Sequence, residues 1–289
     1  MGEFYALACA LVWAFAVVLF RKSGTTVSPL ALNLFRVAIS SVMFVITMII
    51  LKIPLLGQAP LSDYLTLMAS GVIAIAISDT LFHMSLNRVG AGINAIVDSF
   101  YSPSVLVFAY FMLGERVTPL QLLGMGFLVS GLIIATQVKP PPCTCRKELV
   151  VGIALGLAAM GFLGFGIVLA KQVLTGANVI WATAVRQFGS LLVLIPVSLL
   201  QKDRVKTWRV FVPSPSWKFS LPGTILGSYA GLILWIAGMK LIPAGKAAIL
   251  NQSSTLYILL LATLILKEPF GMRKGMAAVL SITGVLLVI

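Results

Sequence analysis

Charged residues are scarce in this sequence and make up only 10% of its 289 positions. A soluble domain carries about 25% charged side chains, which cover the surface that faces water. This composition therefore excludes an ordinary soluble protein. Hydrophobic residues make up 60% of the chain, the mean hydropathy is +1.06, and the polar residues gather between long apolar runs. The pattern indicates a protein that crosses a lipid bilayer several times.

Histidine, cysteine and acidic residues are also rare, with one His, three Cys and eight Asp or Glu. Cys9 lies inside an apolar run, and Cys143 and Cys145 share a loop that offers no further zinc ligands. The sequence contains no glycine-rich phosphate loop and no paired nucleophile and base. We therefore expect no metal site and no cofactor other than a proton or ion gradient, and we do not expect an enzyme.

Basic residues outnumber acidic ones, and the formal net charge is +13. In a soluble protein this excess would suggest a nucleic-acid partner, but here most Lys and Arg lie at the ends of apolar runs and in loops, where they orient a membrane protein. No basic cluster with interleaved aromatic residues occurs. The expected partners are the lipid bilayer and a small-molecule substrate, with no nucleic acid, and we expect the chain to act as a monomer.

Ten apolar runs are candidates to cross a bilayer as helices, which takes about 20 residues each. They lie near 4–20, 31–51, 64–86, 91–113, 118–137, 149–171, 179–200, 220–240, 245–266 and 272–289. The first run is not expected to be a signal peptide, because Glu3 precedes it and Arg21 follows it in place of a cleavage site. The proline-rich linker 139–148 joins a first half, 1–138, to a second half, 149–289.

The two halves match in the register of their charged and small residues, which indicates an internal repeat. The matches at offsets of 150, 152 or 153 include Gly2 with Gly152, Arg36 with Arg186, Gly71 with Gly223, His83 with Trp235, Arg88 with Lys240, Asp98 with Asn251, and Glu115 with Glu268. Five helices, an odd number, turn the second copy upside down relative to the first, and such inverted repeats are typical of transporters. The predicted fold is an all-α integral membrane protein in which ten transmembrane helices form two inverted five-helix repeats around a central cavity.

The sequence also resembles the drug/metabolite transporter superfamily, in the branch with paired EamA domains, over essentially the whole chain. In the first half the resemblance rests on Leu11-Val12-Trp13-Ala14, Asn33-Leu34-Phe35-Arg36 and Leu113-Gly114-Glu115-Arg116. In the second half it rests on Leu266-Lys267-Glu268-Pro269 and on 284–289, and Lys267 and Pro269 depart from the first copy. The resemblance implies a ten-helix transporter with a central cavity that exports amino acids, amines or other metabolites. The expected location is the inner membrane of a prokaryotic cell.

Asp79 and Asp98 are expected near the centre of the membrane. The turn between the third and fourth runs centres near Val89 and Gly90, so both carboxylates lie roughly 13–16 Å deep at 1.5 Å per residue. An ionisable side chain at that depth costs about 2.5–3.5 kcal/mol and is a functional candidate by default. Because the two helices form a hairpin, the carboxylates share one region, and one of the two is expected to hold a proton.

Two polar residues accompany these carboxylates at helical spacing, with His83 four residues after Asp79 and Asn94 four residues before Asp98. We interpret Asp79, His83 and Asp98 as a cluster that binds protons and faces the substrate. The alternative is that Asp79 and His83 pair with each other and pack between helices. Pro103 has no backbone N–H, so the fourth helix is expected to kink just before it and expose backbone to the cavity.

The second half and the aromatic residues complete the candidate site. Asn251 and Gln252 lie in the ninth run at the repeat position of Asp98 and are expected to bind substrate. Trp13, Trp235 and Tyr101 are candidates for an aromatic wall that faces a cationic amine. For Trp13, plain packing between helices is an equally good interpretation.

Arg36 and Arg186 lie close to helix starts, and we expect both to extend to the lipid headgroups. The alternative is a gate, or an anchor for an anionic group of the substrate. With no clearly buried cation, the acidic residues favour zwitterionic or cationic cargo over phosphorylated cargo. Glu115 and Glu268 lie at loop edges and are expected to tie helix ends together.

These features predict a secondary transporter of a small amine or amino-acid-like metabolite that works by alternating access, as an exporter and with proton coupling. The alternative is a sugar or nucleoside carrier of the same fold, with Asn251, Gln252 and Thr255 as partners of hydroxyl groups. A channel would show rings of like residues or a filter sequence, which the sequence lacks. Two signals disagree on orientation: the positive-inside rule places the termini outside, and the family resemblance places them in the cytoplasm.

Overall fold

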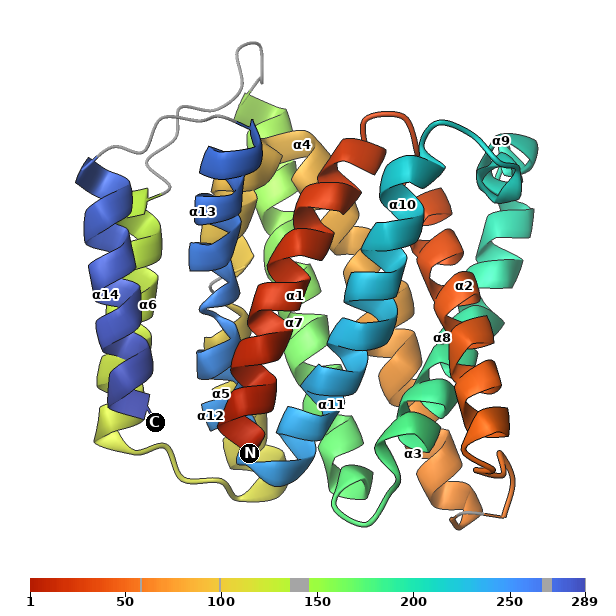
Figure 1. Cartoon of the computed structure of the whole chain (residues 1–289), viewed down its shortest axis with the longest axis horizontal. Coiled ribbons are helices and arrows are strands. Elements are labelled where there is room, and N and C mark those ends of the chain that lie inside the picture. The colour runs from red at the N-terminus through yellow and green to blue at the C-terminus, as the bar shows by residue number, and fades with distance from the viewer. Residues whose placement is uncertain (58, 99, 136–145, 267–271, 289) are drawn as a thin grey trace.

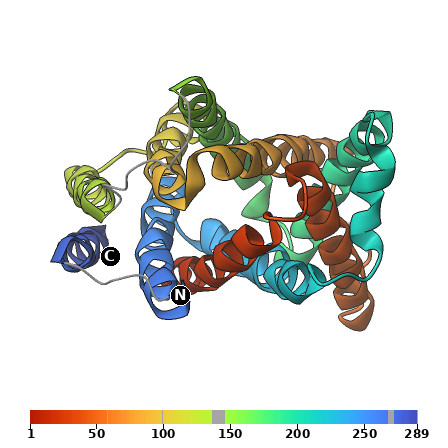
Figure 2. The ribbon, with the colours of Figure 1, turned by 90° about the horizontal axis from the view of Figure 1, so that it is seen from above.

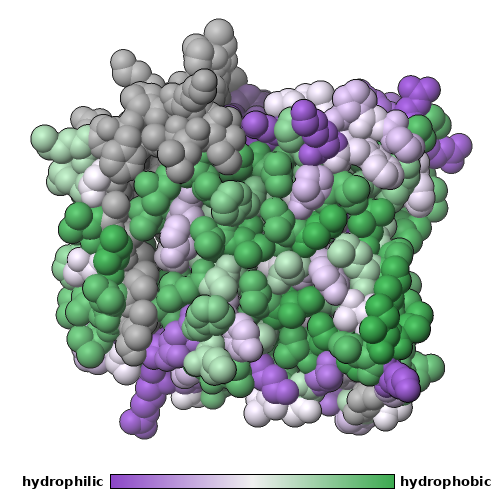
Figure 3. Space-filling view, in the orientation of Figure 1, coloured by the Kyte–Doolittle hydropathy of each residue, from purple (hydrophilic) through white to green (hydrophobic). Residues whose placement is uncertain are grey.

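The computed structural model describes residues 1–57, 59–98, 100–135, 146–266 and 272–288, and within them every regular element is a helix (Figure 1). The six segments that are long and apolar enough to cross a membrane are Gly2–Ser23, Pro29–Ile50, Leu61–Val89, Arg146–Leu174, Val179–Leu200 and Trp217–Leu241. On the face drawn in Figure 3, apolar side chains form a broad band across the molecule, and polar ones gather toward its upper and lower ends. The fold is that of an all-helical integral membrane protein.

Within the described residues, helices lie at each of the ten predicted runs. In chain order they are α1 (Gly2–Ser23), α2 (Pro29–Ile50), α3 (Leu61–Gly71), η1 (Val72–Ile77), α4 (Ser78–Asp98), α5 (Tyr101–Leu113), α6 (Pro119–Ala135), α7 (Arg146–Leu174), α8 (Val179–Leu200), α9 (Arg204–Trp208), η2 (Arg209–Phe211), α10 (Trp217–Gly223), η3 (Thr224–Gly231), α11 (Leu232–Leu241), α12 (Ala244–Asn251), α13 (Ser254–Leu266) and α14 (Met272–Val288). Cys143, Cys145 and Glu268 lie outside the described residues. The count of ten membrane crossings stays a prediction.

Local chemistry explains where the second helix of each half begins. Ser28 precedes α2, and its hydroxyl accepts a hydrogen bond from the Ala31 backbone N–H at 3.4 Å, with Pro29 as the first helical residue. Asn178 precedes α8, and its side chain accepts from the N–H groups of Ile180 at 2.9 Å and Trp181 at 3.2 Å. A side chain that satisfies these free N–H groups fixes the start of a helix.

Seen from above, most helices form a ring, and α6 and α14 stand together at one side of it (Figure 2). These two pack closely against each other and make few contacts with the remaining helices. Within the ring, α1 packs against η3, α11, α12 and α13, and α7 packs against α3, η1, α4 and α5. The first helix of each half therefore contacts the third and fourth helical segments of the other half.

The same contacts between these helices occur twice. Gly2 contacts Ile242, and in the same way Gly152 contacts Val89. Ala16 contacts Gly227, and in the same way Gly166 contacts Ala74. Cys9 Sγ donates to the Gly231 carbonyl at 3.3 Å, and the equivalent hydrogen bond runs from Ser78 Oγ to the Ala159 carbonyl at 2.7 Å. Each pair is related to its counterpart by an offset of 150 in the first helix and 153 in the third segment. Small residues at these contacts allow close packing, which membrane helices need because lipid supplies no hydrophobic drive between them.

The hairpin between the third and fourth runs lies where the sequence predicts it, although its helical hydrogen bonding does not stop there. A side chain at Gly156 of α7 would meet both Ser85 and Val97, and one at Gly152 would meet Val89. The chain therefore reverses direction around Val89, because residues on both sides of it lie at the same level of α7. The assigned helix nevertheless runs unbroken through the bend, from Ser78 to Asp98.

Two stretches of wide, π-helical backbone lie in corresponding segments, at η1 in the third run and at η3 in the eighth. A π-helical turn is rare and occurs mostly at functional sites. Residues from both stretches, among them Ala74, Ile75 and Gly227, line a central cavity. The irregular backbone of each half therefore faces the interior of the ring.

Glycine is required where α3 meets α8. A side chain at Gly71 would overlap the backbone carbonyl of Arg186, and one at Gly189 would overlap the backbone of Met68. Backbone on both sides cannot move aside as a flexible side chain could. These two glycines therefore set the distance between the helices.

Substitution of Gly71 by Ala is expected to lower the free energy of unfolding by about 3 kcal/mol or more, since overpacking forces the two backbones apart. Gly161→Ala in α7 is the matched control, because nothing lies within 4 Å of its added methyl group. The control should be neutral or stabilising by up to about 1 kcal/mol. The measurement is thermal unfolding of the purified variants in detergent, and equal midpoints for the two variants would contradict the packing described.

Candidate functional site

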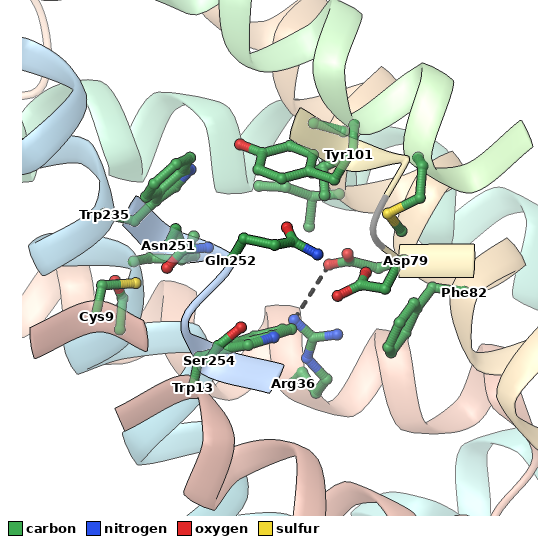
Figure 4. Close-up of a pocket in the computed structure, with 18 of the residues that line it drawn as sticks. Cys9, Trp13, Arg36, Asp79, Phe82, Tyr101, Trp235, Asn251, Gln252 and Ser254 are labelled. Carbon is green, nitrogen blue, oxygen red and sulfur yellow. Dashed lines mark hydrogen bonds and ion pairs between the residues drawn. The ribbon is translucent and has the colours of Figure 1, made fainter. Parts of the chain in front are cut away.

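A cavity of about 90 Å³ lies in the middle of the helix ring (Figure 4). The predicted site residues that line it are Trp13, Arg36, Asp79, Asp98, Tyr101, Arg186, Trp235, Asn251 and Gln252. His83 and Asn94, which the sequence also placed at the site, are buried but do not line the cavity. Asp79 and Asp98 thus share one region, as their positions in the hairpin predict.

Arg36 and Asp79 form a buried ion pair at one wall of the cavity, drawn as a dashed line in Figure 4. Arg36 Nη2 lies 3.1 Å from Asp79 Oδ2, Arg36 Nε donates to Ser228 Oγ at 2.8 Å, and the Arg36 side chain is 3% exposed. The guanidinium also lies 4.9 Å from the ring centre of Phe20 and 5.9 Å from that of Trp13. The prediction that Arg36 extends to the lipid headgroups is therefore wrong.

His83 is a partner of this ion pair. Its Nε2 lies 3.0 Å from Arg36 Nη1. Because a guanidinium has no acceptor, the ring nitrogen has to accept this hydrogen bond, and the imidazole is then neutral. The geometry therefore does not favour the interpretation in which His83 faces the substrate. Its packing beside Asp79 and Arg36 corresponds to the alternative in which polar groups pair between helices.

Arg186 is the second buried cation, and the prediction that it reaches the headgroups is wrong as well. Arg186 is 2% exposed, and its Nε donates to Ser70 Oγ at 3.0 Å. Its Nη1 has no hydrogen-bond partner within the described part of the chain. No described carboxylate lies within ion-pair distance of it. The argument that the site lacks a buried cation therefore fails.

The fourth and ninth predicted helices are both interrupted at the cavity. The first break separates α4, which ends at Asp98, from α5, which begins at Tyr101, and the second separates α12, which ends at Asn251, from α13, which begins at Ser254. At each break a backbone N–H bonds three residues back in place of four, from Phe100 to Val97 at 3.0 Å and from Ser253 to Leu250 at 3.2 Å. These two bonds are related by the offset of 153. The expected interruption before Pro103 occurs, whereas no proline marks the second one.

The breaks place polar side chains at the cavity. Asp98 is half-buried and has no ion-pair partner among the described residues. Asn251 Oδ1 and Gln252 Nε2 are buried atoms without a hydrogen-bond partner in the described structure, although Ser102 Oγ lies 3.4 Å from Gln252 Oε1. An unpaired buried polar group costs about 1–3 kcal/mol. Such groups at a cavity are suited to binding a polar ligand.

Aromatic side chains form part of the cavity wall, as predicted. Tyr101 and Trp235 lie with their ring centres 6.0 Å apart, and both are labelled around the cavity in Figure 4. Trp13 lines the cavity and also packs beside Arg36, and its role toward a cationic amine stays a prediction. The sequence paired Trp235 with His83, but the offset of 153 makes Phe82 its counterpart, and Phe82 lines the cavity too.

Several site residues were missed by sequence reasoning. Ser70 and Ser228 each bind a buried arginine, and Cys9 and Leu232 line the cavity. The serines carried a weak signal, since a hydroxyl within an apolar run often bonds across helices. Leu232 and Cys9 carried none, because they look like ordinary apolar positions.

Glu115 has the role in joining helix ends that its loop position predicts. Its carboxylate accepts hydrogen bonds from the backbone N–H groups of Ala244 at 2.9 Å and Gly245 at 3.2 Å, at the start of α12. Lys171 Nζ lies 4.0 Å from Glu115 and donates to the carbonyl groups of Met239 and Ile242. An acidic group at a helix start and a cation at a helix end are both stabilising.

Asp79→Asn is expected to lower the free energy of unfolding by about 3–5 kcal/mol, because it leaves the Arg36 charge buried and uncompensated. The double variant Arg36→Gln/Asp79→Asn should recover a large part of that loss. Glu148→Gln serves as the control, since it removes the exposed acid of a partly exposed pair with Arg88 (3.3 Å) and should cost less than about 1 kcal/mol. Thermal unfolding in detergent measures all three, and a double variant no more stable than Asp79→Asn would contradict the assignment.

Comparison with known proteins gives relatives at low identity. An uncharacterized transporter of Methanothermobacter thermautotrophicus is 21% identical over 224 residues, which cover 78% of this chain and 64% of that protein. An uncharacterized transporter of Archaeoglobus fulgidus is 20% identical over 282 residues, which cover 96% of this chain and 94% of that protein. A solved crystal structure shares the fold, with a TM-score of 0.76 at 15% identity over 99% of this chain and 95% of that one.

Both halves of the chain match one family. The EamA-like transporter family matches residues 1–137 and again residues 150–289, which are close to the two halves that the internal repeat defines. The match covers nearly the whole sequence, and the relatives named above are described as transporters. The chain therefore belongs to the EamA-like transporter family.

Proposed function

We propose that this protein is a secondary transporter that moves a small amine or amino-acid-like metabolite through the central cavity by alternating access. The single observation that carries the proposal is Asp98, a half-buried carboxylate that lines the cavity at a helix break and has no ion-pair partner in the part of the chain that the structure describes. A carboxylate in this setting is stabilised by a proton or by a cationic group of the cargo. The chemistry of the site therefore favours cargo with an amino group.

Alternating access needs two halves that can exchange roles, and the arrangement of the helices supports this. We propose ten crossings in two inverted five-helix repeats. The repeated contacts between α1 and η3–α11 and between α7 and α3–α4 support a two-fold relation. Helices α1 and α7 run in opposite directions, and α1 begins at the same end of the molecule where α14 ends (Figure 1). An even number of crossings places both ends of the chain on one side.

The interrupted helices support a binding site at the same place. In secondary transporters, discontinuous helices near the midplane direct backbone N–H and carbonyl groups at cargo and ions. Here the breaks at 98–101 and 251–254 and the wide turns of η1 and η3 all lie at the cavity. Alternating access would open this place to the two sides of the membrane in turn.

One end of the helix ring is tied together by charged side chains. At the end where α1 begins, Lys246 Nζ lies 2.9 Å from Glu3 Oε1, Lys240 Nζ donates to the Ala177 carbonyl at 2.7 Å, and Glu115 binds the start of α12. The contacts of Lys246 with Glu3 and of Glu115 with α12 join the two halves, and the contact of Lys240 lies within the second half. They are suited to hold this end closed while cargo exchanges at the other.

Proton coupling, the direction of export and a prokaryotic inner-membrane location complete the proposal. Proton coupling follows from Asp98, which would release a proton when it binds an amino group. Export and location rest on the family resemblance, and a monomer is the proposed functional unit. Asn251 Oδ1 and Gln252 Nε2, which have no hydrogen-bond partner among the described residues, favour a second candidate, a sugar or nucleoside carrier, because amide groups bind hydroxyl groups.

In proteoliposomes, Asp98→Asn is expected to abolish the response of flux to a pH gradient and to lower flux about tenfold or more, as the loss of a charge-assisted hydrogen bond predicts. The measurement is exchange of labelled amino acids and amines across a range of pH gradients. Asp203→Asn, which changes an exposed loop residue in the same way, should leave flux unchanged. A normal pH response in Asp98→Asn would refute the role of this carboxylate, and flux of hydroxyl-rich cargo alone would favour the second candidate.

A further inference from the structure

We infer that the cargo also carries a carboxylate, and that Arg186 binds it. In the second half of the chain this carboxylate would take the position that Asp79 has beside Arg36 in the first half. The inference rests on the proposed function and narrows its cargo from amines in general to molecules with both charges. It depends on a comparison of the two buried arginines, which occupy equivalent positions but differ in their partners: Arg36 contacts both Asp79 and His83, and Arg186 has no described carboxylate within ion-pair distance.

The two arginines share a position and a mode of anchoring. Arg36 and Arg186 are related by the offset of 150 that relates α1 to α7. Both are buried and line the cavity, and each donates its Nε to a serine of the other half, Arg36 to Ser228 at 2.8 Å and Arg186 to Ser70 at 3.0 Å. In each guanidinium the serine therefore holds the Nε group, and the two Nη groups are left to bind other partners.

The partner on the other side is present in only one half. Asp79 lies 3.1 Å from Arg36. The contacts of the third segment follow an offset of 153, as Ala74 with Gly227 and Val89 with Ile242 show. At that offset the counterpart of Asp79 is Leu232, which also lines the cavity. A leucine cannot neutralise a guanidinium, so the second half supplies no counter-ion where the first half has one.

Among the described residues Arg186 has no carboxylate within ion-pair distance and its Nη1 has no hydrogen-bond partner, which is costly for a buried guanidinium. The planar group binds carboxylate or phosphate through parallel hydrogen bonds. The other charges of the cavity select between these anions. Arg36, Arg186, Asp79 and Asp98 sum to zero when all are ionised, so a phosphate dianion would meet the two acidic residues without net compensation. A zwitterion keeps the balance, with its carboxylate at Arg186 and its ammonium at Asp98.

The test compares an amino acid with the same molecule after its carboxylate is removed. The probes are a pool of neutral amino acids, the same amino acids as carboxamides, and the corresponding amines, each added to the purified full chain in nanodiscs. Binding is followed by calorimetry. We expect the acids to bind at least about 30-fold more tightly than the amides, since the amides lose the charged pair with Arg186.

A matched pair of variants places the missing counter-ion in the second half. Leu232→Asp should form an internal pair with Arg186, weaken binding of the acids about tenfold or more, and raise the unfolding midpoint above that of Leu232→Asn. Leu232→Asn has the same shape without the charge and should bind the acids within about threefold of the unchanged protein. If Leu232→Asp does not fold, the ratio of acid to amide affinity in the unchanged protein still decides the question.

The outcomes separate this inference from the function on which it rests. Equal binding of acids, amides and amines, or equal effects of Leu232→Asp and Leu232→Asn, would overturn the role of Arg186 and leave an amine transporter. Binding of none of the three probe sets would overturn the proposed cargo class itself, and the inference with it. A clear preference for acids that disappears in Leu232→Asp alone would support both.

Discussion

A charge among apolar helices is stable only when an opposite charge or several hydrogen bonds accompany it, and the centre of this protein is arranged around that constraint. Arg36 meets it through Asp79, His83 and Ser228. These partners come from α4 and η3, and Arg36 itself lies on α2, so one guanidinium joins segments from both halves of the chain. Removal of a single partner would leave the others buried and unsatisfied, which gives the contact a structural role beyond its own strength.

The positions of these charges depend in turn on helix packing. Gly71 and Gly189 bring α3 and α8 into contact through their backbones, and the contact at Gly71 is with the carbonyl group of Arg186. The guanidinium of Arg186 therefore extends from a backbone that cannot shift along α3. Ser70, the neighbour of Gly71, binds its Nε. Close packing and the hydrogen bond at one level of α3 together fix where the second cation enters the cavity.

The helices and part of the site could be predicted from the sequence, because both follow from local patterns. Apolar runs of sufficient length identify helices, and the spacing of Asp79 and Asp98 from a turn near Val89 places both at one cavity. The burial of Arg36 and Arg186 could not be predicted in this way. A residue near a helix start is at the headgroups only if that start is at the membrane surface, and this depends on how the whole helix packs.

The pairing of the two halves shows a second limit of sequence comparison. Gly71 with Gly223 and Arg88 with Lys240 suggest an offset of 152, and this offset pairs His83 with Trp235. The contacts of Ala74, Ser78 and Val89 instead correspond to an offset of 153 between the two halves. A difference of one residue turns a helix by about 100°, so it changes which side chains face the cavity. Only contacts between helices fix the register that matters for the site.

At the offset of 153 the two halves keep the same scaffold and differ in charge. Asp79 and Asp98 both belong to the first half, and their counterparts Leu232 and Asn251 are neutral. Each half nevertheless keeps its arginine. Charge is therefore balanced across the whole cavity and not within either copy. Asp98 of the first half and Arg186 of the second, neither of which has an ion-pair partner among the residues that the structure describes, line a common space. An asymmetric charge pattern on a repeated scaffold gives the cavity a polarity, and it favours a ligand with separated charges over one with a single charge, because neither end is then left without a counter-ion.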